Sequence, residues 1–229
     1  MKSFTIFFFA SLILISCKDS KNTSEAIEST PIVVEKNLTT AEKIAEANGF
    51  EHWKEVSEIQ FTFNVDRDEN HFERSWRWKP KTNDVAMITA KDPISYNRTR
   101  MDSLVMNTDA GFINDKYWLL APFNLVWDEG ITFSEKQNVQ APISRDTLSL
   151  LTIVYGPEGG YTPGDAYDFY FGSDFIIKEW SFRKSNAETP SLTTTWEDYE
   201  DFKGINIAKM HQDSTGGFKL YFTNISIKK

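Results

Sequence analysis

Two carboxylates near the end of the chain have the spacing of a catalytic pair. Asp198 and Glu200 lie two residues apart in a segment that also contains Trp196 and Phe202. On an extended strand such residues share one face about 7 Å apart, a separation compatible with the acid and base of a glycosidase. A solvated strand end in an acidic protein gives the same pattern, and no other feature marks an acid with a raised pKa. We therefore expect no enzyme, and a glycan hydrolase is the least favoured interpretation.

Residues that bind metals are scattered along the chain. His52, His71 and His211 are the only histidines, and none has the spacing to another histidine or a cysteine that a zinc site needs. We interpret them as surface or hydrogen-bonded residues. The acidic segment 66–70 lacks the glycine and the terminal glutamate of a calcium loop, so it predicts a turn. The sequence predicts no cofactor, no metal and no catalytic residue.

The single cysteine, Cys17, directly follows a short apolar run. The run covers residues 4–15 behind Lys2, and as a helix it would span about 18 Å, less than the roughly 30 Å of a hydrocarbon core. Its length and flanks predict a secretory signal peptide in residues 1–16. The quartet Leu-Ile-Ser-Cys resembles the lipobox of bacterial lipoproteins, which implies cleavage before Cys17 and its lipidation. An ordinary cleaved signal with a chance cysteine is the alternative.

A polar segment and an acidic composition follow from the same first reading. Residues 17–38, rich in Ser, Thr, Glu and Lys, predict a flexible tether behind the lipidated cysteine. The formal net charge of −8 argues against nucleic acid as a partner. We expect a monomer held by its lipid in the cell envelope, at the outer membrane, on the periplasmic face or at the surface.

Residues 39–229 are expected to form one domain that begins with a helix. Thr39 and Glu42 have the spacing of a capping box, and Asn48-Gly49 supplies a stop. From Ile59 onward apolar and polar residues alternate in short segments, the pattern of antiparallel strands with one buried face. We expect strands at 59–65, 72–78, 85–90, 131–134, 149–155, 167–171, 175–182, 193–202, 205–211 and 218–227, with weaker candidates at 94–100 and 103–106. Their short connections favour a meander.

One apolar segment, residues 117–127, breaks this alternation. Asn114 or Asp115 can cap a short helix here, and Pro122 is expected to end it. Because the segment is too apolar for an idle surface loop, we expect it to lie over the sheet as a lid.

Several of these features together resemble a known superfamily. The N-terminal helix, Gly49, Trp53, the insert 117–123 and the run from Asp198 to Ile205 are similar to the LolA/LolB-like lipoprotein-sorting superfamily, and more closely to Bacteroidota lipoproteins of unknown function with that fold. The resemblance implies an eleven-stranded half-barrel with a helical lid and a hydrophobic cavity for acyl chains. The expected fold is thus mainly β, an antiparallel curved half-barrel with one N-terminal helix and a short helical lid insert.

Aromatic residues share faces of several expected strands. Such stripes usually form core, but on the concave face of a curved sheet they can equally line a cavity for an apolar ligand. We predict that a lipid or acyl chain contacts Phe61, Phe63, Trp76, Trp78, Met87, Trp118, Leu119, Phe123, Phe169 and Trp180. The alternative is a surface glycan-binding lipoprotein. A lipid binder hides its tryptophans in a concavity, whereas a glycan binder displays them on a flat or convex face.

Overall fold

The computed structural model describes residues 37–158 and 162–229, so the expected signal peptide and Cys17 lie outside the described part. Helices and strands follow in the order α1 (Thr40–Ala47), α2 (Phe50–Trp53), β1 (Glu58–Arg67), β2 (Asn70–Lys79), β3 (Asp84–Ile88), β4 (Ile94–Asn97), α3 (Met106–Trp127), β5 (Ile131–Gln140), β6 (Thr147–Tyr155), β7 (Ala166–Phe171), β8 (Ile177–Arg183), β9 (Leu192–Thr195), β10 (Glu197–Phe202), β11 (Ile205–Gln212) and β12 (Phe218–Lys228). A 3-10 turn, Lys184–Asn186, follows β8.

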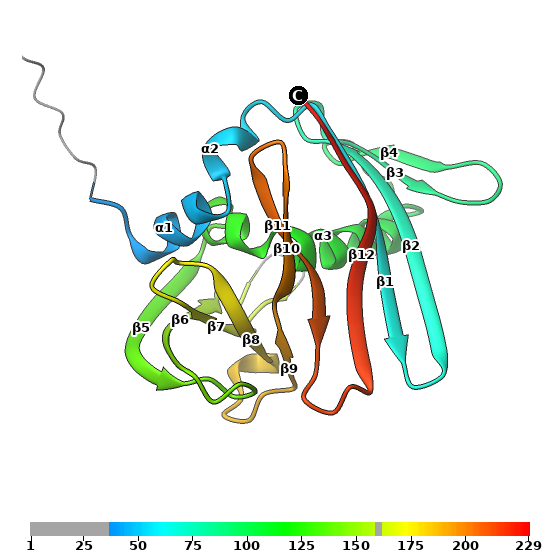
Figure 1. The fold of residues 1–229 in the computed structure, drawn as a ribbon. Coiled ribbons are helices and arrows are strands. Elements are labelled where there is room, and N and C mark those ends of the chain that lie inside the picture. Colours follow the sequence, from blue (N-terminus) through cyan, green and yellow to red (C-terminus); the bar gives the residue numbers. More distant parts are fainter. Residues whose placement is uncertain (1–36, 159–161) are drawn as a thin grey trace, which may run out of the picture. The chain divides into compact units, whose positions relative to one another are not determined.

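The strands form two antiparallel sheets that do not close into a barrel (Figure 1). The seven-stranded sheet has the order β10-β11-β12-β1-β2-β3-β4, and the five-stranded sheet has the order β5-β6-β7-β8-β9. The second sheet is the expected meander. In the first, the last strand returns beside the first, with Phe222 opposite Phe63. The expected fold class, a mainly β open half-barrel, is confirmed.

The two sheets meet where one expected strand divides. Residues 193–202, expected as a single strand, form β9 and β10, which lie in different sheets. The backbone N–H of Trp196 still donates to the Lys178 carbonyl of β8, at 2.7 Å, and the chain then pairs with β11. The Thr195 hydroxyl accepts a hydrogen bond of 3.2 Å from the backbone N–H of Gln212. This division gives the described part twelve strands rather than the eleven that the resemblance implies.

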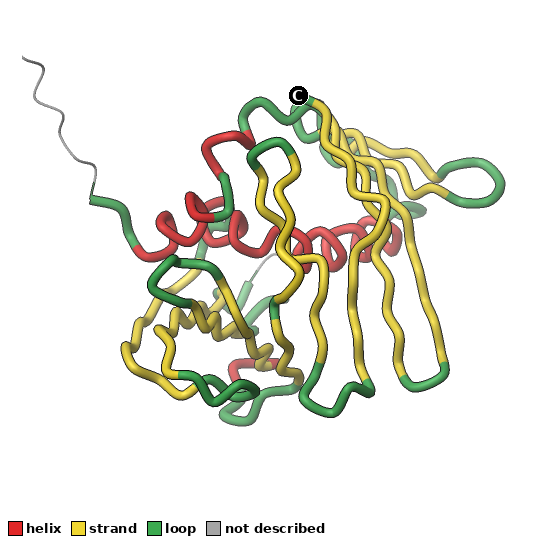
Figure 2. Tube along the Cα trace, viewed as in Figure 1, coloured by secondary structure: helices red, strands yellow, loops and turns green. Residues whose placement is uncertain are grey.

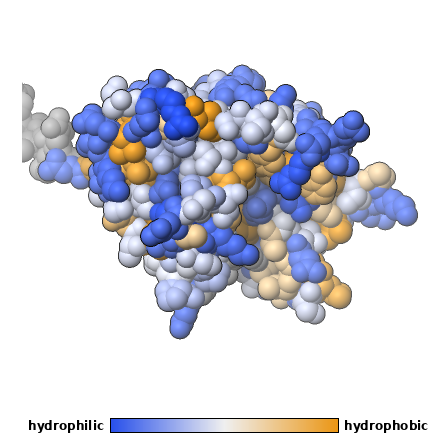
Figure 3. All heavy atoms as spheres, turned by 90° about the horizontal axis from the view of Figure 1, so that it is seen from below, coloured by the Kyte–Doolittle hydropathy of each residue, from blue (hydrophilic) through white to orange (hydrophobic). Residues whose placement is uncertain are grey.

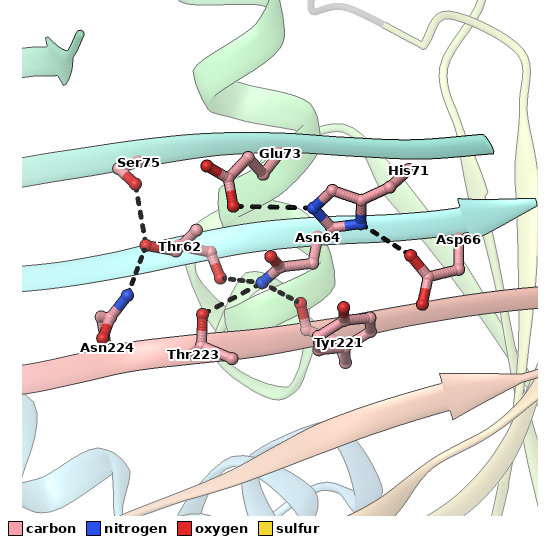
Figure 4. A network of polar contacts seen from close by, with 9 residues as sticks. All are labelled: Thr62, Asn64, Asp66, His71, Glu73, Ser75, Tyr221, Thr223 and Asn224. Atoms are coloured by element: carbon pink, nitrogen blue, oxygen red, sulfur yellow. Dashed lines mark hydrogen bonds and ion pairs between the residues drawn. The ribbon is translucent and has the colours of Figure 1, made fainter. Parts of the chain in front are cut away.

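The seven-stranded sheet has one apolar and one polar face. Phe61 and Phe63 on β1 are buried on the apolar face, whereas Thr62 and Asn64 between them take part in a polar network across three strands (Figure 4). The Thr62 hydroxyl lies 2.8 Å from that of Ser75 on β2, and the Asn64 amide donates to the Thr223 hydroxyl of β12 at 3.2 Å. Since this face is satisfied by its own side chains, the apolar face is the one that needs a cover.

Helix α3 supplies that cover, and it is longer than expected. It runs over 22 residues, from Met106 to Trp127, and crosses behind the strands in Figure 2. Proline removes a backbone donor and clashes with the preceding turn, which led us to expect a stop at Pro122. Instead Leu120 leaves the helical region (φ −130°, ψ 25°) and the helix continues beyond a kink. The expectation that Pro122 ends the helix is therefore wrong.

The start of α3 also corrects the sequence analysis. Asn114 and Asp115, the expected caps, lie inside the helix. The weak strand candidate at 103–106 is a turn in which the Asp102 carboxylate accepts from the backbone N–H of Leu104, at 2.9 Å. In the described part of the chain, no helix has the length and apolar character needed to cross a membrane.

The N-terminal helix forms as its caps predict. Thr39 and Glu42 make the reciprocal capping box, and Gly49 takes a left-handed conformation (φ 84°) at which the chain turns into α2. The backbone N–H of Asn206, in β11, donates to the Asn48 carbonyl at 3.0 Å. The helical pair α1–α2 is thereby fixed against the β10–β11 hairpin.

Candidate functional site

The ten residues predicted to contact a ligand come together in one interior cluster. Five lie on β1, β2 and β3, three on α3, and two on β7 and β8. All are buried except Met87, which packs half-buried against the others. The four tryptophans among them, Trp76, Trp78, Trp118 and Trp180, are at most 8% exposed. The predicted tryptophans are therefore hidden between α3 and the sheets rather than displayed.

The first part of α3 spans the interior from one sheet to the other. Phe112 packs edge-to-face on Trp76 and Trp78 of the seven-stranded sheet, with ring centroids 5.4 and 5.6 Å apart. One and a half turns later, Trp118 packs on Trp180 of the five-stranded sheet at 4.4 Å. Phe112 is absent from the predicted set because it precedes the apolar run that marked the insert.

The part of α3 beyond the kink has different neighbours. Phe123 packs on Phe50 and Trp53 of α2, with centroids 5.3 and 5.7 Å apart. Trp127 packs on Trp53 at 5.0 Å. Leu120 thus divides α3 into a segment over the sheets, which we call the cover segment (residues 106–119), and a segment fixed to α2.

Two buried ion pairs attach the cover segment to the seven-stranded sheet. The Arg74 guanidinium of β2 makes two hydrogen bonds to the Asp115 carboxylate, at 2.9 and 2.6 Å, and the Trp76 indole N–H adds a third at 2.8 Å. Asp109 pairs with Arg98, just after β4, at 2.8 Å. Both aspartates are fully buried. Burial raises the pKa of Asp115 although Arg74 favours its charged form. We call these pairs the latch.

A buried lysine lies beside the latch. The Lys116 ammonium stands over the rings of Trp78 and Trp127, 6.0 and 5.3 Å from their centroids. Desolvation lowers the pKa of Lys116 to about 8, while the nearby Asp128 carboxylate opposes the shift. The Tyr155 hydroxyl of β6 donates to Asp128 at 2.6 Å. Sequence analysis missed these polar groups, because an acid or lysine inside an apolar run gives no sign of its partner.

Hollows in the surface lie away from this interior. One of about 330 Å³ is lined by Asp66, Asp68, Glu69, Asn70, His71, Gly216, Gly217 and Lys219. Another of about 360 Å³ is lined by Arg77, Lys79, Asp84, Val85, Ala86, Ser95 and Tyr96. None of the ten predicted residues lines either hollow, so access to them requires movement of the cover segment.

Exposed apolar side chains gather beside the start of that segment. Apolar atoms concentrate over one side of the molecule in Figure 3, next to a surface that is otherwise largely hydrophilic. The large apolar side chains with substantial exposure are Phe72, Ile88, Ile94, Leu104, Met106 and Phe133. All but Phe133 belong to β2, β3, β4 or the entry to α3. Leu104, which precedes the cover segment, is 86% exposed.

The candidate chemical residues take other positions. Asp198 and Glu200 are exposed on β10, and both pair with Lys209 of β11, at 3.1 and 2.7 Å. His71 is exposed beside Asp66, whose hydrogen bond raises the pKa of the imidazole. His211, expected at the surface or hydrogen-bonded, is instead fully buried. Within the described ranges, no group of three or more acidic, histidine or cysteine side chains can hold a metal ion.

Comparison with known proteins gives similarities at the level of solved structures. No protein-family model matches the chain, and no curated protein matches it by sequence. A LolA superfamily protein from Nitrosomonas europaea is similar at 13% identity and a TM-score of 0.46, over 84% of this chain and 95% of that one.

Two further solved structures are similar to about the same degree. A DUF1329 family protein from Desulfovibrio piger has 8% identity and a TM-score of 0.43, over 82% of this chain and 92% of that one. An outer membrane lipoprotein-sorting protein domain from Vibrio parahaemolyticus has 12% identity and a TM-score of 0.43, over 82% and 94%. The superfamily that the sequence resembles is thus the one that the comparison with solved structures returns.

Proposed function

We propose that the interior between the two sheets and α3 binds an apolar ligand of the acyl-chain type, and that the cover segment moves aside to admit it. The observation that supports this most is the combination of an aromatic interior with a cover held by buried ion pairs. Phe112 and Trp118 supply the apolar contacts, and Asp109 and Asp115 supply the attachment.

The energetics of the latch favour a removable cover. A buried ion pair contributes little net stability, because the loss of hydration largely offsets the attraction, and apolar replacements are often more stabilising by about 1–4 kcal/mol. When the cover segment lifts, Arg74 and Asp115 return to water and regain that hydration. An acyl chain can meanwhile take over the apolar contacts that Phe112 and Trp118 give up. A helix fixed by apolar side chains alone would have no such compensation.

The kink and the exposed apolar residues support the same motion. Leu120 already lies outside the helical region, so a change there can turn the cover segment while the segment on α2 stays in place. Leu104 and Met106 expose apolar surface at the free end of that segment. Contiguous apolar surface of this kind often marks a binding site.

The proposed protein acts at a membrane. Lipid on Cys17 and a tether up to residue 38 hold the domain close to acyl chains in the cell envelope. The buried positions of Trp76, Trp118 and Trp180 support an apolar ligand over a glycan, because a sugar-stacking site needs displayed rings.

Binding can be measured on the Cys17→Ser chain, which has no thiol to lipidate. We expect a fluorescent fatty acid to bind saturably, near one per chain, and to be displaced by unlabelled fatty acid. Absence of saturable binding by a folded protein would contradict the proposal.

The latch gives a sharper test of the mechanism. Arg74→Met with Asp115→Leu should stabilise the cover and slow uptake at least several-fold, since opening would then expose apolar side chains without regaining ionic hydration. The matched control is Arg183→Met with Asp168→Leu, because that pair is also little exposed, with its atoms 2.7 Å apart, but lies within the five-stranded sheet. Equal uptake rates in the latch variant and the control would contradict a moving cover.

A further inference from the structure

A set of buried polar atoms at the junction of the two sheets has no partner within the described part of the chain. They are the indole nitrogens of Trp180 and Trp196, the hydroxyl of Thr194, and both ring nitrogens of His211. These four residues are at most 3% exposed. Buried polar atoms without a hydrogen bond are rare in folded proteins, and each costs about 1–3 kcal/mol, so a group of them needs an explanation.

These atoms belong to one aromatic cluster. The Trp196 ring lies 4.5 Å from His211 and 5.6 Å from Trp180, measured between centroids. Thr194 stands directly opposite Trp180 in the β8–β9 ladder, so the two side chains share a face. Trp118 of the cover segment packs on Trp180 at 4.4 Å and on His211 at 5.4 Å. Movement of the cover segment would therefore uncover the cluster, which we call the junction cluster.

The chemistry of the junction cluster is rich in donors. An indole N–H can only donate, a neutral imidazole has one donor and one acceptor, and a hydroxyl has both. Desolvation lowers the pKa of His211 to about 3, although the backbone of Thr195 and Ala208 favours the charged ring, so the imidazole is neutral at pH 7. A neutral site with excess donors fits an oxygen acceptor that carries no full charge, because an unpaired buried charge costs far more than a dipole.

We infer that the junction cluster is the polar subsite of the interior and receives the carbonyl oxygen of an acyl group, from either an acyl ester or a protonated fatty acid. This inference rests on the proposed function and deepens it. The hydrocarbon chain lies along the aromatic interior, and the indole N–H groups of Trp180 and Trp196 donate to the carbonyl. The Thr194 hydroxyl and the imidazole N–H of His211 complete the set of donors.

The subsite can be tested with ligands of equal chain length. On the Cys17→Ser chain, methyl palmitate, palmitic acid and heptadecane are compared as competitors of a fluorescent alkyl probe. We expect the ester to bind about tenfold more tightly than the alkane, the effect of roughly one good hydrogen bond. Tighter binding of palmitic acid at pH 5 than at pH 8 points to a protonated acid as the source, and ester binding that is unchanged by pH points to acyl esters.

Substitutions locate the preference. Trp196→Phe and His211→Phe should remove the advantage of the ester over the alkane and leave alkane affinity within about twofold. Trp78→Phe is the matched control, because its indole nitrogen is also buried without a partner but lies outside the junction cluster. It should leave the advantage intact. Should His211→Phe fail to fold, Trp196→Phe still decides the matter.

The possible failures are distinct. If neither alkane nor ester displaces the probe from the unsubstituted site, the proposed function itself is wrong. If alkane and ester bind equally well, or Trp196→Phe weakens both alike, the subsite is overturned and the junction cluster holds a buried water only. Alkane binding would then leave the proposed apolar interior in place.

Discussion

At the scale of single residues, Arg74 links the sheet to the helix that covers it. Its guanidinium is the charged partner of Asp115, which is fully buried. Removing one member of a buried pair leaves the other charge without compensation, which typically costs about 3–5 kcal/mol. We predict that Arg74→Ala lowers the free energy of unfolding by that amount, measured by urea denaturation.

The partner substitution separates the missing charge from missing contacts. Arg74→Ala with Asp115→Leu should recover most of the loss, because no buried charge remains. If the single substitution changes stability by less than about 1 kcal/mol, Asp115 is not held by Arg74 in solution.

His211 makes stability depend on pH. Its pKa is about 3 in the folded chain against an ordinary value of 6.5, so at intermediate pH only the unfolded chain takes up the proton. Folding stability is then complete above about pH 7 and decreases as the pH falls toward 3. Two pKa units correspond to about 3 kcal/mol, so we predict a loss of that size from this residue at pH 4.5.

Denaturation of two variants checks the assignment. His211→Phe should remove most of this pH dependence between pH 7 and 4.5, because Trp118, Trp196 and Phe222 surround the ring and none of them titrates. His71→Gln should keep it, since His71 is exposed and its pKa is shifted upward. An unchanged pH slope in His211→Phe would show that the imidazole is not buried.

Residue types in sequence showed which side chains would be inside, but not the pairs they would form. Alternation along β2 predicts that Trp76 and Trp78 are buried, and they are. The partner of Arg74 lies 41 residues away in the chain, and no local pattern connects them. His211 looks the same in sequence whether it faces water or the junction cluster. Long-range pairing of strands decides such contacts.

At the scale of elements, a glycine contact fixes the helical pair α1–α2 to the β10–β11 hairpin. A Cβ at Gly49 would lie 1.7 Å from the carbonyl oxygen of Gly204, and the φ of Gly49 is +84°. We predict that Gly49→Ala is severely destabilising, because both the left-handed backbone and the backbone contact oppose a side chain.

Gly130→Ala is the control for this prediction. Its φ is +70°, but a Cβ there meets nothing within 4 Å, so only backbone strain of about 1–2 kcal/mol is expected. Chemical denaturation should show that Gly49→Ala costs at least about 1 kcal/mol more. Equal losses would mean that the close approach to Gly204 is relieved in solution.

The elements themselves were largely predictable from the sequence, and the exceptions have physical causes. Period-two alternation found β1, β2, β7, β8 and β12. Pro122 suggested a helix end, but a proline needs only a local distortion, which Leu120 provides. The division of β9 from β10 was not predictable, because alternation continues while the hydrogen-bonding partner changes at Trp196.

At the scale of the whole molecule, attachment to the membrane is expected to depend on one residue. Cys17 is the only cysteine, and no helix of the described residues can cross a membrane. We predict that Cys17→Ser releases the protein from the membrane fraction while its unfolding transition is unchanged. Cells are fractionated with a high-salt wash, and the wild type is the control. A variant that stays with the membranes after this wash would contradict lipidation at Cys17 as the anchor.

The central claim is that an acyl chain occupies the interior beneath the cover segment, and photo-crosslinking tests it most directly. The Cys17→Ser chain is irradiated with a fatty acid that carries a diazirine near its methyl end, and crosslinked peptides are identified by mass spectrometry. We predict adducts on peptides that contain Phe112, Trp118 and Trp180, all suppressed by excess unlabelled fatty acid. Adducts confined to exposed residues such as Leu104 and Ile88, without suppression, would contradict the claim.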